Sequence, residues 1–334
     1  MKKFLNDPAR FVDEMLEGIY RAHPRQLTYV ADDLRCMVTA RPKPGKVGIA
    51  TGGGSGHLPV FLGYVGDGML DGAAVGGVFQ SPSAEQMYEV TKAIDQGAGV
   101  LYIYGNYTGD IINFDMAAEL ADLDGIAVKQ VVGNDDAASS VVGEEHKRRG
   151  VAGIFFLFKA AGAAAAEGLS LDEVTRIADK ARLNTRTIGV ALSSCVVPEV
   201  GHATFSIGED EMEIGMGIHG EPGISRKTLA PADAVVDEMM ARLFAEQDVG
   251  PGAEVAVLVN GLGGTPKEEL YILFRRVSQL LEARGATARH VFIGEYATAM
   301  EMAGASISML VLDEELERLI DAPAHTPFVA HVKL

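Results

Sequence analysis

Short apolar runs alternate with segments of helical periodicity along the whole chain, and this alternation limits the possible fold more than any other feature. Several runs are apolar at nearly every position, which is typical of strands covered on both faces. Alternation of strands and helices indicates an α/β protein. We therefore expect mostly parallel or mixed sheets flanked by helices. The predicted strands are residues 47–51, 99–105, 128–133, 153–158, 187–194, 254–261, 290–296 and 306–313.

Three helices are predicted from their start signals. Ser170 begins a capping box and precedes apolar residues at helical spacing. Thr265 begins a second capping box, with Pro266 at the first helical position. Ser81 and the proline after it open a third helix.

The length of 334 residues suggests two domains. We place the boundary between them just before the predicted strand at 187–194. Residues 1–183 would then form an N-terminal α/β domain and residues 184–334 a C-terminal α/β domain. The Gly/Pro segment 248–254 is an alternative linker, although we interpret it as a loop within the second domain.

The formal net charge of −17 argues against binding to nucleic acid or to an anionic membrane surface. The basic run at 146–150 is too short for a binding patch, and we interpret it as a solvated helix end. Segment 151–166 is the longest apolar stretch, but Lys159 interrupts it and it is too short to span a bilayer.

The first ten residues contain no apolar core of a signal peptide, so we expect a cytoplasmic protein. The two cysteines, Cys36 and Cys195, form no metal-binding or redox motif. They are expected to be packing thiols in a reducing compartment.

A glycine-rich loop at 51–59 follows the first predicted strand. Successive glycines allow positive φ angles and let backbone N–H groups approach a ligand oxygen. The segment also contains His57, and it is not a P-loop because GxxxxGK[ST] is absent. A tight turn is the alternative, but a turn does not need this many glycines.

Asp110 lies in the segment Asn-Tyr-Thr-Gly-Asp (106–110), after another predicted strand. Ligands bind at the carboxyl ends of strands in α/β sheets, and a carboxylate there can act as a general base. A helix N-cap is the competing interpretation of this aspartate.

His219 lies in a third glycine-rich segment, 215–223, which formally contains GxGxxG. The segment follows the acidic stretch 209–214, where no strand is predicted, and it contains Glu-Pro, so a dinucleotide site is not expected. A histidine between glycines has an accessible ring, as a nucleophile or a metal ligand needs. Solvation alone is the alternative explanation.

Two weaker possibilities remain open. Segment 260–266 is an anion-binding helix start or a structural turn. His57, Asp110 and His219 are of the ligand types that zinc prefers, but the sequence has no HExxH and no local pair, so no metal is predicted.

Taken together, these segments resemble the dihydroxyacetone-binding subunit of dihydroxyacetone kinases, the DhaK family. The resemblance covers essentially the whole chain. Its most specific parts are Gly-Gly-Gly-Ser-Gly-His (52–57), Asn-Tyr-Thr-Gly-Asp (106–110) and Gly-Ile-His-Gly-Glu-Pro-Gly (217–223).

The resemblance implies a mechanism. His219 would form a covalent hemiaminal with a small ketose, and only a carbonyl compound can make that bond. Asp110 would help remove the proton of the reacting hydroxyl, while His57 would hold or polarise the same region. The backbone of residues Gly53, Gly54, Ser55 and Gly56 would bind the oxygens of the substrate.

The family also implies a partner. This chain has no nucleotide motif and no room for the nucleotide domain of fused relatives, so a separate DhaL-type subunit would carry ATP or ADP with Mg²⁺. The phosphoryl donor would be ATP or a phosphotransferase-system protein. The resemblance further implies a homodimer.

Two departures from the family pattern concern the substrate. Leu58 replaces a common glutamate, and Gly105 replaces a common lysine. We hypothesise that the site accepts a larger ketose such as erythrulose. A dihydroxyacetone-sensing co-regulator without kinase activity, and a metal-dependent hydrolase or aldolase, are the other classes considered.

Overall fold

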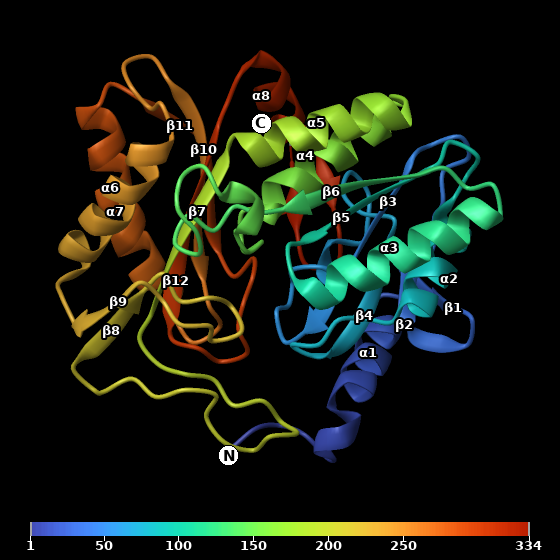
Figure 1. The fold of residues 1–334 in the computed structure, drawn as a ribbon, viewed down its shortest axis with the longest axis horizontal. Helices are drawn as coiled ribbons and strands as arrows, with labels where there is room; N and C mark the ends of the chain where they lie inside the picture. The colour runs from blue at the N-terminus through green and yellow to red at the C-terminus, as the bar shows by residue number, and fades with distance from the viewer. Residues whose placement is uncertain (1, 333–334) are drawn as a thin grey trace.

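The computed structural model describes residues 2–332, which form two six-stranded mixed sheets with helices between them and outside them (Figure 1). In the first sheet, the order is β1-β2-β4-β3-β5-β6. Strands β4, β3, β5 and β6 run parallel, while β1 and β2 are antiparallel additions at one edge. The bounds are β1 (Leu27–Val30), β2 (Asp33–Thr39), β3 (Gly48–Ser55), β4 (Gly72–Val78), β5 (Val100–Gly105) and β6 (Val128–Gly133).

The second sheet has the order β11-β10-β12-β7-β8-β9. Only β10 and β11 are parallel, and the other neighbours are antiparallel. A two-stranded sheet, β13 (Ala324–His325) with β14 (Ala330–His331), follows near the C-terminus. The bounds are β7 (Thr185–Ala191), β8 (Glu211–Ile214), β9 (Ser225–Thr228), β10 (Glu254–Gly261), β11 (Thr287–Gly294) and β12 (Gly304–Val311).

The helices form three groups. Helices α2 and α3 cover the outer face of the first sheet, and α6 and α7 cover the outer face of the second. Helices α4 and α5 lie against the inner side of the first sheet, where α4 also contacts α8. The bounds are α1 (Phe11–Ala22), α2 (Ala84–Ile94), α3 (Thr108–Leu123), α4 (Ile154–Ala166), α5 (Leu171–Leu183), α6 (Ala232–Glu246), α7 (Lys267–Ala283) and α8 (Glu314–Asp321).

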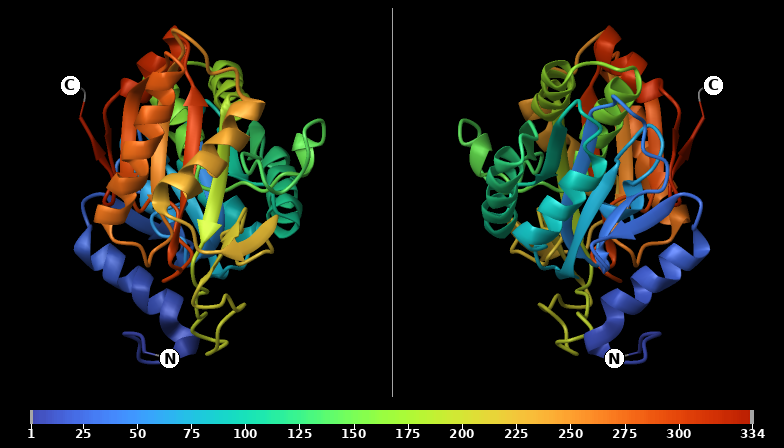
Figure 2. Two further views of the ribbon diagram at one scale, coloured as in Figure 1. Left: turned by 90° about the vertical axis from the view of Figure 1, so that its left-hand side faces the viewer. Right: turned by 90° about the vertical axis from the view of Figure 1, so that its right-hand side faces the viewer.

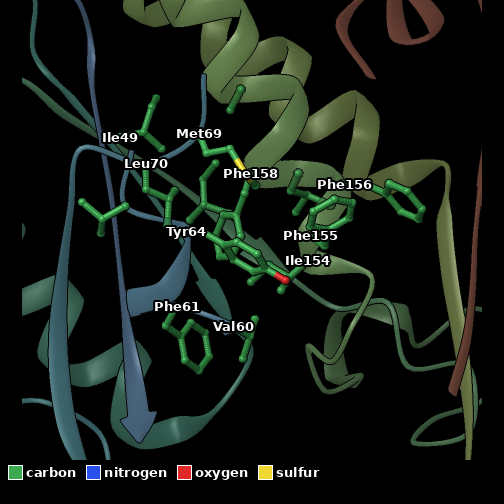
Figure 3. Packing of buried hydrophobic residues seen from close by; sticks show 14 of the residues in the cluster. Ile49, Val60, Phe61, Tyr64, Met69, Leu70, Ile154, Phe155, Phe156 and Phe158 are labelled. Carbon is green, nitrogen blue, oxygen red and sulfur yellow. The ribbon is translucent and has the colours of Figure 1, made fainter. Parts of the chain in front are cut away.

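The predicted strand at 153–158 is wrong, because these residues begin helix α4. Every residue of α4 from Ile154 to Ala165 is buried, since side chains from both sheets and from the loop after β3 surround the helix. Figure 3 shows Phe155 and Phe158 near Tyr64, whose ring centroid lies 5.6 and 5.8 Å from theirs. A helix that is apolar on all sides has no amphipathic period, so a short window cannot distinguish it from a buried strand.

The other predicted strands are present. Strands β7, β11 and β12 are shifted by two or three residues at both ends, and β3 ends four residues later than predicted. Strands β1, β2, β4, β8 and β9 were not predicted. Strand β4 is rich in glycine and alanine, so it lacks the β-branched pattern of a typical strand. Strands β8 and β9 are only four residues long, which is too short for a clear pattern.

The predicted helix starts are right in one case of three. Ser170 caps α5 by accepting the Glu173 N–H. Helix α2 begins after Ser83, which forms a complete capping box with its third helical residue, and Ser81 precedes this cap. Thr265 does not cap α7, since its hydroxyl donates to the Gly304 carbonyl and Pro266 takes the N-cap position.

The predicted boundary at 183/184 falls in the short connection between α5 and β7. The chain after β12 returns to the first half, where Thr326 donates to the Gly63 carbonyl and His325 bridges to Asp67. The largest core cluster contains residues from both halves. The division into two domains stays a prediction. Figure 2 shows α1 at the end of the molecule opposite α4 and α5.

The basic run at 146–150 is not a solvated helix end. Arg148 is fully buried and binds Glu246 through two hydrogen bonds of 2.5 and 2.9 Å. Both cysteines are buried and free. Within the described residues, no helix is long and apolar enough to cross a bilayer.

Candidate active site

Strand β3 carries the glycine-rich segment further than the sequence indicated, because the strand continues to Ser55. Of its glycines, only Gly56 has a positive φ, of 95°. At Gly54, a Cβ would lie 2.7 Å from both the Phe79 Cα and the Gln80 N, so the glycine is needed for close approach. The hydroxyl of Ser55 is buried and has no hydrogen-bond partner.

His57 follows this strand and is 1% exposed. Its Nδ1 lies 2.7 Å from the carbonyl oxygen of Thr298. A carbonyl only accepts, so Nδ1 carries the proton and Nε2 has a free lone pair. That Nε2 is buried and has no partner. Burial, and then the nearby charge of His219, lower the pKa of His57 to about 3, so the ring is neutral at ordinary pH.

His219 lies on the irregular loop between β8 and β9, with its side chain 23% exposed. Glu221 holds it twice. Glu221 Oε1 lies 2.9 Å from the His219 Nδ1, and Oε2 accepts the His219 backbone N–H at 3.0 Å. Burial opposes ionisation of Glu221, but the hydrogen bond and charge of His219 prevail and lower the Glu221 pKa to about 2. An ionised carboxylate only accepts, so Nδ1 carries the proton and Nε2 has its lone pair free.

Aromatic rings bring the two loops together. The ring centroids of His57 and His219 are 4.8 Å apart, and His57 stacks on Phe79 at 4.7 Å. The ring of Phe79 also contacts His219 at 5.3 Å. Tyr107 meets His219 edge-on at 4.7 Å and donates its hydroxyl to the Gly150 carbonyl. The imidazole of His219 is therefore held among three aromatic rings, while its side chain stays 23% exposed.

Asp110 lies in the first turn of α3 and is 5% exposed. It is not the helix N-cap, a position that Tyr107 takes. Its Oδ1 is buried without a partner. Burial raises the Asp110 pKa to about 6, although a hydrogen bond from Ser81 and the charge of His219 oppose the rise. A carboxylate with such a pKa changes its protonation state close to neutral pH, as a general base requires.

The fourth glycine-rich segment has a structural role. Asn260 is fully buried, and its amide oxygen accepts the backbone N–H groups of Tyr296 and Ala297. These bonds hold the loop whose Thr298 carbonyl binds His57. Among the described residues, no group of three or more metal-ligating side chains lies together.

Several contacts of the site were missed in the sequence. The sequence analysis assigns no role to Glu221, although a carboxylate two residues after a histidine is an available signal. Phe79, Tyr107 and Thr298 gave no sign of their contacts, and Thr298 lies 241 residues from His57. Such contacts depend on how the two sheets are placed.

Comparison with known proteins identifies the family. A model of the Dak1 domain matches residues 17–328. The chain belongs to the Dak1 domain family. The predicted resemblance to dihydroxyacetone kinases is confirmed, and with it the assignment to a family of kinase subunits.

Two Dak1 relatives and one solved structure place the chain more closely. It is 48% identical to the PTS-dependent dihydroxyacetone kinase 2, dihydroxyacetone-binding subunit DhaK, of Listeria innocua, covering 98% of this chain and 99% of that protein. It is 44% identical to the D-erythrulose kinase of Mycolicibacterium smegmatis, covering 98% of this chain but 56% of that protein.

The solved structure is the dihydroxyacetone kinase of C. freundii in its native form. It matches with a TM-score of 0.90 and 34% identity, over 99% of this chain and 60% of that chain. The expected pair of mixed sheets flanked by helices is therefore the fold of a known Dak1 kinase.

Proposed function

We propose that this chain is the substrate-binding subunit of a dihydroxyacetone kinase, and that it captures a small ketose as a covalent hemiaminal on His219. The observation that carries the proposal is that buried polar atoms of three residues predicted for the site have no hydrogen-bond partner. They are the Ser55 Oγ, the His57 Nε2 and the Asp110 Oδ1. Buried polar atoms in native proteins are nearly always hydrogen-bonded, so this set indicates a polyhydroxylated ligand.

The capture step needs a neutral imidazole with a free Nε2. The Nε2 lone pair of His219 attacks the ketone carbon, and the electrons of the C=O double bond move to the oxygen. Nδ1 becomes more acidic as the new bond forms, and the Glu221 carboxylate, 2.9 Å away, accepts its proton. A proton returns to the former carbonyl oxygen, so the hemiaminal has the atoms and charge of ketone plus imidazole. Glycerol has no carbonyl group and cannot follow this route.

Asp110 and His57 act on the hydroxyl group that is to be phosphorylated. The unpartnered Oδ1 of Asp110 accepts this hydroxyl and removes its proton during phosphoryl transfer. The Nε2 of His57 is an acceptor that stays neutral, so it orients the substrate without competing for the proton. Backbone groups of Gly53, Gly54 and Gly56, with the Ser55 hydroxyl, hold the remaining oxygens.

The phosphoryl group would come from a second subunit of DhaL type that carries ATP or ADP with Mg²⁺. The Listeria relative supports this arrangement, since it is named as one subunit of a PTS-dependent kinase and matches over 99% of its length. That name also favours a phosphotransferase-system protein as donor. We further propose a cytoplasmic homodimer, which light scattering of the purified chain tests directly.

A related ketose is the second candidate substrate, because one relative is named as a D-erythrulose kinase. The two departures from the family pattern, Gly105 and Leu58, lie in different surroundings. A Cβ at Gly105 would lie 3.0 Å from the Tyr107 ring, so that glycine makes room for Tyr107. Leu58 lines a surface hollow with Phe4, Phe11 and Met15, which belong to the N-terminal segment.

Titration with carbonyl-¹³C dihydroxyacetone, followed by NMR, tests the capture. The ketone resonance should move to a tetrahedral-carbon position with the wild-type chain and stay unchanged with His219→Ala. His202→Ala is the matched control, since that histidine is exposed on a loop. A parallel titration with erythrulose ranks the two ketoses.

No tetrahedral signal with either ketose would contradict the proposal. A coupled assay with the nucleotide-bearing subunit then separates kinase from sensor. Phosphorylated ketose supports the kinase, whereas capture without turnover would identify a sensing co-regulator.

A further inference from the structure

An ion-paired chain of side chains leads from the interior to the back of His219. It runs from Asp136, on the loop after β6, through Arg149 to Glu221, and all three side chains are mostly buried. We propose that Asp136 and Arg149 are positioning residues for His219 and act through Glu221. The inference rests on the proposed function, because it assigns these residues to the nucleophile of that site.

Asp136 fixes the side chain of Arg149 on the side away from Glu221. Asp136 is 3% exposed, and its Oδ2 accepts a hydrogen bond from the Arg149 Nε at 2.8 Å. The Arg149 Nη2 lies 2.8 Å from the same oxygen as an ion-pair contact. The other oxygen of Asp136 accepts the Ala138 N–H at 3.0 Å. With both oxygens occupied by fixed donors, the carboxylate sets the orientation of the planar guanidinium.

Arg149 in turn contacts the His219 loop at two points. Its Nη2 donates to the Gly215 carbonyl at 3.0 Å, where the loop begins, and its Nη1 lies 3.8 Å from the Glu221 Oε2. A Cβ at Gly217 would clash with that Oε2 and lie 2.6 Å from Nη1. The missing side chain at Gly217 therefore leaves room for the Arg149 guanidinium to approach the Glu221 carboxylate. This explains why glycine occupies the second position of the formal GxGxxG pattern.

The role of Asp136 and Arg149 follows from the different partners of the two carboxylate oxygens of Glu221. Oε2 faces Arg149 and the His219 backbone N–H, so Oε1 is left for Nδ1. Without Arg149, the Glu221 carboxylate, 31% exposed, is free to turn toward water. The imidazole would then lose the acceptor that keeps the proton on Nδ1, and the tautomer protonated on Nε2, which cannot attack a ketone, would become populated.

The neighbouring arginine offers a matched control. Arg148 is also buried, and it is also paired with a carboxylate, but its partner is Glu246 at the end of α6. Arg186 also binds Glu246, at 3.2 Å, so the carboxylate keeps a cation when Arg148 is changed. A substitution at 148 perturbs a buried ion pair without touching the His219 loop.

The test uses the whole chain labelled with ¹⁵N-histidine and free of ketose, at about pH 8. The ring signals of His219 are assigned with His219→Gln. In the wild type, we expect the tautomer protonated on Nδ1. In Arg149→Met, the other tautomer should increase several-fold, and ketose affinity in the ¹³C titration should fall about tenfold or more, as for outer partners of metal-bound histidines.

Two further variants guard against misfolding, since Arg149→Met leaves Asp136 buried and unpaired. The double change Asp136→Asn with Arg149→Gln removes both charges, and Arg149→Lys keeps the positive charge. The double change should behave like Arg149→Met, and Arg149→Lys should be intermediate. Circular dichroism confirms the fold of each variant.

An unchanged tautomer in a folded Arg149 variant would overturn the inference, as would an equal change in Arg148→Lys. Because the tautomer is measured without ketose, this outcome is separate from failure of the proposed function, which appears as a missing tetrahedral signal in the wild type.

Discussion

The two histidines of the site come from different sheets and are held by different kinds of acceptor. His57 follows β3 of the first sheet, and a peptide carbonyl binds its Nδ1. His219 follows β8 of the second sheet, and the carboxylate of Glu221 binds its Nδ1. A carbonyl orients an imidazole but cannot take its proton, whereas a carboxylate does both. This difference favours His219 as the nucleophile and His57 as a neutral acceptor.

Burial points the same way. His57 is 1% exposed, and its pKa of about 3 keeps the ring uncharged. The side chain of His219 is 23% exposed, so a ketose can reach it. Under the proposed function, the first sheet would provide the fixed His57 and the second sheet the reactive His219.

His219→Gln should have the largest effect, because a glutamine has no nucleophilic nitrogen. We expect complete loss of the ¹³C hemiaminal signal and of turnover. The His57→Gln variant in the same titration should still form the hemiaminal. If both variants lose the signal equally, the two histidines are not separated in function as we propose.

Asp110→Asn should keep ketose capture but lower turnover about 10²–10⁴-fold, the usual contribution of a general base. Turnover by the wild type at saturating ketose, where capture on His219 is complete, should also fall about tenfold per pH unit below about pH 6, because burial raises the pKa of the Asp110 carboxyl to about 6 and the protonated form is inactive. Glu221 and His57 change protonation at much lower pH and do not contribute there. Unaltered turnover in the coupled assay of Asp110→Asn would contradict the assignment.

His57→Gln should lower turnover less, by roughly 10–100-fold, because the ring orients the hydroxyl and moves no proton. A glutamine amide can donate to the Thr298 carbonyl and still present an acceptor. The decrease in turnover of His57→Gln relative to the wild type should be the same at every pH from about 5 to 8, since the ring of His57 stays neutral throughout. A pH-dependent difference between wild type and variant would instead indicate proton transfer by His57.

The smallest expected effect is on stability. The folded-state pKa of Asp110, about 6, lies above its ordinary value of 3.8, so folding favours the protonated carboxyl. This contribution is present at acid pH and is lost as pH rises from about 4 to 6. Above that range, the buried carboxylate destabilises the fold. Asp110→Asn should therefore raise the free energy of unfolding by about 1–3 kcal/mol at pH 8, and by less at pH 4. Urea unfolding at both pH values measures the difference, and an equal gain at both would exclude this origin.

Much of the fold could be predicted from the sequence because its signals are local. The bounds of β6 and β10 are those predicted, since each is a short valine-rich run that ends at a glycine. Helix α4 could not be predicted, because two layers cover it and its apolar residues follow no period. The start of α7 was mistaken because Thr265 bonds to a distant strand instead of its own helix.

The candidate site divides in the same way. The sequence by itself determined which residues are candidates for chemistry: the glycines before Ser55, two histidines set among glycines, and a carboxylate after a strand. Only the tertiary structure decided their states. The Thr298 carbonyl on His57, the burial of Asp110 and the approach of Arg149 to Glu221 join residues that lie far apart in the chain. Proton positions and pKa values depend on such neighbours, because electrostatic interactions act through space and not along the sequence.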